Sequence, residues 1–346
     1  MNQSPLASLH SDAGATMTTV DDWSIPEAFS STEAECAAAS QGAGLLDLAH
    51  IGTISLEGPD ARRFANGMFT NNIRDLEVGQ CGRSAMCDDR GRVQGLLDVY
   101  CTDTDRFEGV LEGVTAEWFE SRYEMYIVFD DVEMEVSQGE PWVLSIQGPE
   151  AAAVLTRAGL PTPLPGHHIQ TDSGTRIVNK DRTGLGGFDV VVSTADIEDT
   201  WKQLIDAGAC AMGHGALDQL RIQNGRASWP TDGTEKSLVH ELGINEEVCN
   251  FNKGCYLGQE VINRIDVKGQ VNKRIHRIHV EGNPENLVGS AVFVDEKQVG
   301  TITSAAHVPE GTIALSVLRK AAWGENQQVQ ISSSSGDMTG TVLVQP

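Results

Sequence analysis

The chain of 346 residues is long enough for two or three domains, and with 40% hydrophobic and 21% charged residues its composition is that of a globular protein. Its 25 basic and 49 acidic residues give a net charge of −24, which disfavours nucleic acid and anionic membranes as default partners. The longest uncharged stretch is too short to span a bilayer. Seven scattered cysteines without a CxxC pair indicate a reducing cytoplasm rather than a disulfide scaffold.

The first elements predicted are a flexible tail, a helix and a strand. Residues 1–20 are rich in Ser, Ala and Thr and lack the charged and apolar regions of a signal peptide. Residues 26–40 predict a helix with Pro26 in its first turn. Residues 51–57 predict a short strand.

One local pattern then occurs twice. The strand at 51–57 ends in Gly58-Pro59-Asp60 and is followed by a helix pattern over 61–68. The strand at 143–147 ends in Gly148-Pro149-Glu150 and is again followed by a helix pattern. A unit repeated only once indicates two similar α+β subdomains rather than a solenoid.

The rest of the chain predicts a mixed middle region and an all-β end. Between the copies, strands surround a helix over 114–125, and helices over 195–207 and 216–223 follow the second copy. From residue 271 onward, short β runs recur with Gly, Asn and Pro between them, which is typical of a small β-barrel. The predicted fold is therefore α+β, with two similar α/β subdomains and a C-terminal small β-barrel.

The expected boundaries follow from these elements. They are a flexible tail at 1–20, a discontinuous first subdomain at 21–57 and 142–245, a second subdomain at 58–141, a connecting segment at 246–272 and the barrel at 273–346.

A basic segment stands out in this acidic chain. Residues 253–277 carry a net charge of +4, which attracts anions inside a repulsive field. The segment begins with KGCYLGQE, in which a thiol follows a lysine and two glycines permit close backbone approach. A cation favours the thiolate form of Cys255, and a buried structural cysteine is an equal alternative.

The KGCYLGQE sequence followed by Arg264 resembles the YgfZ family of folate-binding proteins, which act in iron–sulfur protein maturation and repair. The wider chain is similar to the superfamily that also contains the glycine-cleavage T-protein, an aminomethyltransferase. The matching segments are, in order, LDLAHIGTISLEGPDARRF, FTNNIRDLEVGQ, DDRGRVQGLLDVY, LSIQGPEAAAVL, RTGLGGFDV and LDQLRIQNGRASWP. This resemblance implies a T-protein/TrmE-type folate-binding fold arranged around a central channel, with tetrahydrofolate or a folate derivative as cofactor.

The resemblance also separates two chemistries. Aminomethyl transfer needs a carboxylate near the pterin, and in the T-protein pattern that acid stands in a Gly-Gly-x-x-Asp-Asp run. Gly95 and Leu96 occupy the two acid positions here, and Asp98 lies on the opposite strand face from Gly95. The T-protein's Tyr-Thr-Gly-Glu loop is likewise reduced to residues 185–187. These differences argue against aminomethyl transfer and leave folate binding open.

The resemblance assigns two groups of site residues. The functional thiol is Cys255, supported by Lys253, Tyr256, Gln259 and Glu260. The folate-binding candidates are Arg221, Asn71, Asn72, Asp189 and Arg264. A surface helix arginine, a turn and an outward strand residue are the structural alternatives for Arg221, the two asparagines and Asp189. One thiol cannot complete a [4Fe-4S] site, so no stably bound metal is expected.

Three hypotheses for the function follow. The first is a tetrahydrofolate-binding accessory protein for the assembly or repair of iron–sulfur proteins, cytoplasmic, monomeric, and in contact with iron–sulfur client or assembly proteins. The second is a folate-dependent aminomethyltransferase or demethylase of the T-protein type, against which Gly95 argues. The third is an interaction protein with a vestigial pocket, against which the complete Cys motif argues.

Overall fold

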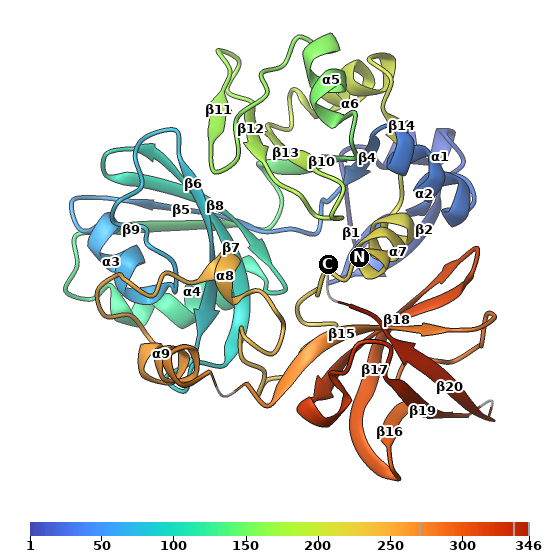
Figure 1. Cartoon of the computed structure of the whole chain (residues 1–346). Coiled ribbons are helices and arrows are strands. Elements are labelled where there is room, and N and C mark those ends of the chain that lie inside the picture. The colour runs from blue at the N-terminus through green and yellow to red at the C-terminus, as the bar shows by residue number, and fades with distance from the viewer. Residues whose placement is uncertain (270, 335, 345–346) are drawn as a thin grey trace.

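The computed structural model describes residues 1–269, 271–334 and 336–344. Three lobes surround a common centre (Figure 1): a first sheet flanked by helices, a second sheet with its own helices, and a closed barrel. The predicted combination of two α/β subdomains and a C-terminal barrel is confirmed.

The first lobe is a six-stranded sheet in the order β11-β12-β13-β10-β4-β14. Its strands are β4 (Gly44–Asp47), β10 (Trp142–Gln147), β11 (His168–Gln170), β12 (Arg176–Asn179), β13 (Gly187–Val192) and β14 (Cys210–Ala211). Helices α5 (Ala151–Arg157) and α6 (Ile197–Asp206) bury their apolar faces against this sheet.

The second lobe is a five-stranded antiparallel sheet in the order β6-β7-β8-β5-β9. Its strands are β5 (Thr53–Glu57), β6 (Cys81–Cys87), β7 (Val93–Asp103), β8 (Arg106–Glu112) and β9 (Glu133–Ser137). Helices α3 (Ala61–Met68) and α4 (Ala116–Tyr123), with the short 3-10 turn η1 (Glu124–Tyr126), cover one face. Because β5 pairs with β8 and β9, the boundary between the subdomains lies before residue 53, and the expected boundary after residue 57 is wrong.

The third lobe is a closed barrel in the order β15-β18-β17-β16-β19-β20. Its strands are β15 (Lys273–Val280), β16 (Ala291–Val294), β17 (Lys297–Val308), β18 (Gly311–Arg319), β19 (Gln328–Ser333) and β20 (Gly336–Val342), with η2 (Lys320–Ala322) after β18. Between the second sheet and the barrel, the chain forms α8 (Asn245–Val248) and α9 (Gln259–Lys268).

The repeated Gly-Pro-acid turns have one physical cause. Gly58 and Gly148 have φ angles of 135° and 132°, a region that side chains rarely adopt. A Cβ at Gly58 would overlap the carbonyl oxygen of Asp131, and one at Gly148 would overlap those of Ala39 and Gly42. Glycine therefore lets each strand turn closely over a neighbouring segment before its helix begins.

The N-terminal residues differ from the expected flexible tail. They form β1 (Asn2–Gln3), α1 (Ala7–Asp12) and β2 (Thr16–Val20), and the small sheet is completed by β3 (Trp23–Ala28). Leu6 is fully buried in the core of the first lobe, and the imidazole of His10 lies 2.8 Å from the buried carboxylate of Asp47. These contacts with the first lobe order the segment.

The expected helix over 26–40 begins later than predicted. Pro26 lies in β3, and α2 covers Thr32–Gln41. The hydroxyl of Ser31 accepts a hydrogen bond of 3.2 Å from the backbone N–H of Ala34, so a serine cap rather than the proline starts the helix. The last helix of the first lobe, α7, covers His214–Gln223.

The two sheets face each other across a shared core. This core joins apolar residues of the first sheet with Tyr100 and Val110 of the second sheet and with α2 and α7. Facing sheets bury their inner rows of side chains against one another, and the polar residues at the edge of such a contact meet in a confined space. The candidate site lies at that edge.

Candidate functional site

A polar cavity of about 330 Å³ lies between the two sheets and the start of α7. Its chemically active wall residues are His50, Arg83, Glu112, Lys180, Arg182, His214, Arg221, Arg226 and Trp229. A second cavity, of about 460 Å³, shares Arg83, Asp181, Arg226 and Ala227 with the first and reaches Arg274 of the barrel. We call the two adjoining cavities the central channel.

Arg83 of β6 organises the acids on one side of the channel. Its guanidinium donates to Glu112 at 2.6 Å and to Glu247 at 2.8 Å, and lies 3.8 Å from Asp98. Glu112 ends β8 and Glu247 lies in α8, so a single arginine connects the second sheet to the connecting segment.

The facing side of the channel comes from the loop after β12. Lys180 donates to Asp98 of β7 across the two sheets, at 2.6 Å. Arg182 donates to the fully buried Asp189 at 2.6 Å, and Ser145 donates to the same carboxylate at 2.7 Å. Because each buried charge has a partner, the cost of removing it from water is offset.

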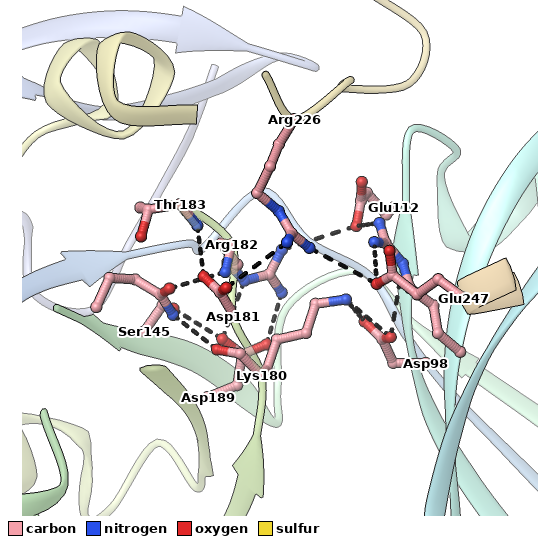
Figure 2. Close-up of polar contacts among 12 residues, drawn as sticks. Asp98, Glu112, Ser145, Lys180, Asp181, Arg182, Thr183, Asp189, Arg226 and Glu247 are labelled. Atoms are coloured by element: carbon pink, nitrogen blue, oxygen red, sulfur yellow. Dashed lines mark hydrogen bonds and ion pairs between the residues drawn. The ribbon is translucent and has the colours of Figure 1, made fainter. Parts of the chain in front are cut away.

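Arg226 lies between the two halves of this network (Figure 2). Its guanidinium is 3.6 Å from Asp181 and 3.7 Å from Glu247, longer contacts than those of Arg83. It also lines both cavities. Because its ion pairs are longer, an incoming anion that binds Arg226 disrupts weaker contacts than one that binds a tightly paired cation of the channel.

Glu112 stays ionised in the channel. Burial by itself raises the pKa of this carboxyl, but the charges of Arg83, Lys180 and Arg182 outweigh burial and lower the pKa to about 2. The channel therefore offers a fixed negative charge held among cations.

We expect this shift to appear as a pH dependence of stability. A carboxyl whose pKa is lower in the folded state stabilises that state above its unfolded pKa near 4.5, and this contribution is lost as the pH falls toward 2. Between about pH 6 and pH 3, Glu112 accounts for a loss of roughly 2 kcal/mol in the free energy of unfolding. Urea unfolding across this range should show a smaller decline for Glu112→Gln than for the wild type, and parallel declines would contradict the assignment.

Two histidines add neutral polar groups to the wall. The rings of His50 and His214 meet edge to face with centroids 5.7 Å apart. Burial lowers the pKa of His50 to about 3 and also lowers that of His214, so that neither ring is charged at neutral pH. Among the described residues, neither Nδ1 atom has a hydrogen-bond partner, and both atoms are shielded from solvent.

The strand pairing of β7 shows which side chains lie near Gly95 and Leu96, the two positions where the T-protein pattern has an acid. Gly95 faces the core under α3 and α4, because a Cβ there would lie 2.7 Å from the side chain of Met86 in that core. Leu96 and Asp98 share the opposite face. Leu96 pairs directly with Glu112 of β8, and directly paired residues project to one side with Cβ atoms about 5 Å apart. A carboxylate therefore stands on the neighbouring strand beside the acid position.

Of the predicted folate residues, Arg221 alone lines the channel. It is buried, and its guanidinium donates to Asp232 at 2.7 Å, to Asp218 at 2.6 Å and to Ser304 of the barrel at 3.1 Å. With all of these partners, Arg221 holds α7 against the barrel while forming part of the channel wall.

The other predicted folate residues lie elsewhere. Asn71 donates to the carbonyl of Arg83 at 2.7 Å and Asn72 to Asp75 at 2.8 Å, so both organise a turn. Asp189 lies behind Arg182 as its counterion. Arg264 lines a separate cavity next to α9.

The Cys motif also lies outside the channel lining. Cys255 is exposed, and Tyr256 is buried in the cluster beneath it. The ammonium group of Lys253 donates to the carbonyls of Phe69 and Asn71 at 2.7 and 2.5 Å. Burial lowers the pKa of Lys253 to about 7. This lysine anchors the segment to the second lobe, and the functional role of Cys255 stays a prediction.

The remaining motif residues shape the start of α9. Gln259 donates to the carbonyl of Gly254 at 3.4 Å, and Glu260 is exposed. Gly258 caps the helix at φ 82°, where a Cβ would lie 2.6 Å from the carbonyl oxygen of Asp88. Gly258 is thus required by close packing on the second lobe.

We expect Gly258→Ala to lower the free energy of unfolding by about 2–3 kcal/mol, from strain and from the displaced Asp88 loop. Gly254→Ala is the matched control in the same motif, because a Cβ there meets nothing within 4 Å. Chemical unfolding of the two variants measures the difference, and equal stabilities would contradict the packing role.

The sequence did not single out most of the channel charges, which are Arg83, Glu112, Lys180, Arg182 and Arg226. They come from distant segments and share no motif. Two of them could have been found from the sequence, because they lie in segments that match the T-protein superfamily. Arg182 lies in RTGLGGFDV and Arg226 lies in LDQLRIQNGRASWP.

The sequence profile of the family described as GCVT N-terminal domain matches residues 6–253, more than half of the chain. The chain belongs to this family. The GCVT match contains both sheets and every charged residue of the channel network apart from Arg274 of the barrel.

Curated GCVT relatives cover most of the chain. An aminomethyltransferase of Rubrobacter xylanophilus is 29% identical over 318 residues, which are 89% of this chain and 84% of the relative. An aminomethyltransferase of Listeria innocua is 25% identical over 99% of this chain and 97% of the relative. The fold is that of the glycine cleavage system aminomethyltransferase T from Bartonella henselae, with a TM-score of 0.91, 22% identity, and coverage of 100% of this chain and 97% of the other.

These relatives correct the first hypothesis. The expected role as an accessory protein for iron–sulfur proteins is wrong, because the curated relatives that cover the chain are aminomethyltransferases. The resemblance holds at the level of the T-protein superfamily. Among the described residues, no group of three or more His, Cys, Asp or Glu side chains is placed to hold a metal ion. In the same residues, no helix combines the length and apolar character needed to cross a bilayer.

Proposed function

We propose that this chain binds a reduced folate in the central channel and transfers a one-carbon unit between the folate and an aminomethyl donor. The proposal follows the aminomethyltransferases to which the chain is similar. The observation that carries it is the ionised Glu112 carboxylate, which lines the channel. Glu112 pairs with Leu96, which stands at one of the two positions where the T-protein pattern has an acid.

The channel supplies the three kinds of group that such a reaction needs. The neutral rings of His50 and His214 offer a donor and an acceptor edge to a pterin. Arg226, with Arg274 in the second cavity, supplies cations for the carboxylates of a glutamate tail. An aminomethyl group that loses its amine passes through an iminium-like cation, which a fixed carboxylate such as Glu112 stabilises.

A two-step experiment tests the proposal. Calorimetric titration with tetrahydrofolate should give one site per chain, and Arg226→Gln should weaken it because Arg226 lines both cavities. Ammonia release from an aminomethyl donor, measured with and without tetrahydrofolate, then tests transfer. If the wild type does not bind tetrahydrofolate, the proposal is wrong; if it binds but releases no ammonia, folate binding stands and transfer is excluded.

A further inference from the structure

A third cavity lies outside the central channel and has no part in the proposed function. It has a volume of about 390 Å³ and lies between α9, residues 238–241 and residues 271–272. It shares no lining residue with either cavity of the channel. Arg264, the last residue of the Cys motif, lines this cavity and does not line the channel.

A buried histidine lines this cavity without a partner. His240 is 5% exposed, and in the part of the chain that the structure describes neither of its ring nitrogens has a hydrogen-bond partner. An unpaired buried polar group costs about 1–3 kcal/mol, so the site favours a ligand that supplies the missing hydrogen bond. Burial lowers the pKa of His240, and the neutral ring retains one N–H donor.

Two cations line the same cavity from α9. Arg264 and Lys268 are four residues apart and therefore share one helix face. Within residues 1–269, 271–334 and 336–344, neither forms an ion pair, whereas the arginines of the channel are paired. Both side chains are exposed, so an anion that enters the cavity from solvent can reach them.

Acidic neighbours do not neutralise this pair. Glu241 also lines the cavity, but its carboxylate accepts a hydrogen bond of 3.3 Å from the backbone N–H of Leu238. Asp266 contributes a negative field at His240 from α9 and lies outside the cavity lining. The lining therefore keeps an excess of positive charge.

We propose that this cavity binds a phosphate group, either as the free ion or as a monoester. A tetrahedral dianion presents enough acceptor oxygens for Arg264, Lys268 and the N–H of His240 at once, and its charge matches the two cations. A monocarboxylate carries one charge and two oxygens, so it leaves one of these donors unused. The site is independent of folate and of one-carbon transfer.

Binding is measured on the full chain by calorimetric titration in low salt, with inorganic phosphate and ribose 5-phosphate as separate ligands and acetate as the carboxylate comparison. We expect a Kd of about 1 mM or below for at least one phosphate ligand and weaker binding of acetate. Tighter binding of inorganic phosphate identifies the free ion, and tighter binding of the sugar phosphate identifies a monoester. Absence of phosphate binding at about 10 mM, or equal binding of acetate, would overturn the proposal.

Two variants locate the site. Arg264→Gln combined with Lys268→Gln should weaken phosphate binding at least tenfold. Lys297→Gln combined with Arg319→Gln removes the same charge from exposed positions of the barrel and should leave binding unchanged. Equal losses in the two double variants would show a general charge effect and overturn the site.

His240→Phe provides a test that does not depend on net charge. The substitution keeps a ring next to Phe251 and removes the two unpaired nitrogens, so the thermal midpoint should stay the same or rise. Phosphate binding should nevertheless weaken several-fold, because the imidazole donor is lost. A variant that remains folded and binds phosphate like the wild type would contradict the role of His240.

Discussion

Replacing Asp232 by alanine is expected to lower the free energy of unfolding by about 3–5 kcal/mol. The Asp232 carboxylate is fully buried and accepts hydrogen bonds from Arg221 at 2.7 Å, Ser304 at 2.6 Å, Thr303 at 2.5 Å and the backbone N–H of Ser228 at 2.9 Å. Alanine would leave the buried guanidinium of Arg221 without this anion. Because these contacts join α7 to the barrel, we expect the whole chain to lose stability.

Urea unfolding of three further proteins makes this test specific. Asp172→Ala removes an exposed carboxylate and should change little. Asp232→Asn keeps the shape and should lose less than Asp232→Ala. Arg221→Met combined with Asp232→Leu removes both charges and should recover part of the loss. A loss below about 1 kcal/mol for Asp232→Ala would show that Arg221 does not depend on this carboxylate.

Glu112→Gln is expected to slow one-carbon transfer by about 100-fold while leaving the Kd for tetrahydrofolate nearly unchanged. The amide keeps the size of the side chain and removes the negative charge that would stabilise an iminium-like centre. Arg83 retains Glu247 and Asp98 as partners, and Lys180 retains Asp98, so the channel keeps its shape. The rate of ammonia release at saturating folate measures the effect.

Glu133→Gln is the matched control for this prediction. Glu133 is an exposed residue of β9 and does not line the channel, so the substitution should leave transfer unchanged. If Glu112→Gln transfers at the wild-type rate, the carboxylate required by the chemistry is another group, and Asp98 is the next candidate on the same face. A large loss of folate affinity in Glu112→Gln would instead assign this residue to binding.

Local patterns predicted the elements that depend on neighbouring residues. The glycines at 58 and 148 mark turns that other residues rarely adopt, and the β runs after residue 271 alternate with turn residues, so the repeat and the barrel were visible in the chain. The N-terminal segment was mispredicted because its order depends on Leu6 and His10 packing on residues of the distant first lobe.

The sequence by itself determined the T-protein superfamily and the α+β class with its barrel, because turn residues, hydrophobic periods and short motifs act over a few positions. Only the tertiary structure decided which side chains form the channel. Glu112 stands across from Leu96 and Lys180 reaches Asp98 because strand pairing and the contact between the two sheets set which distant residues meet. Glu112 and Leu96 are neighbours across two strands and lie far apart in the sequence, so no local pattern records their proximity.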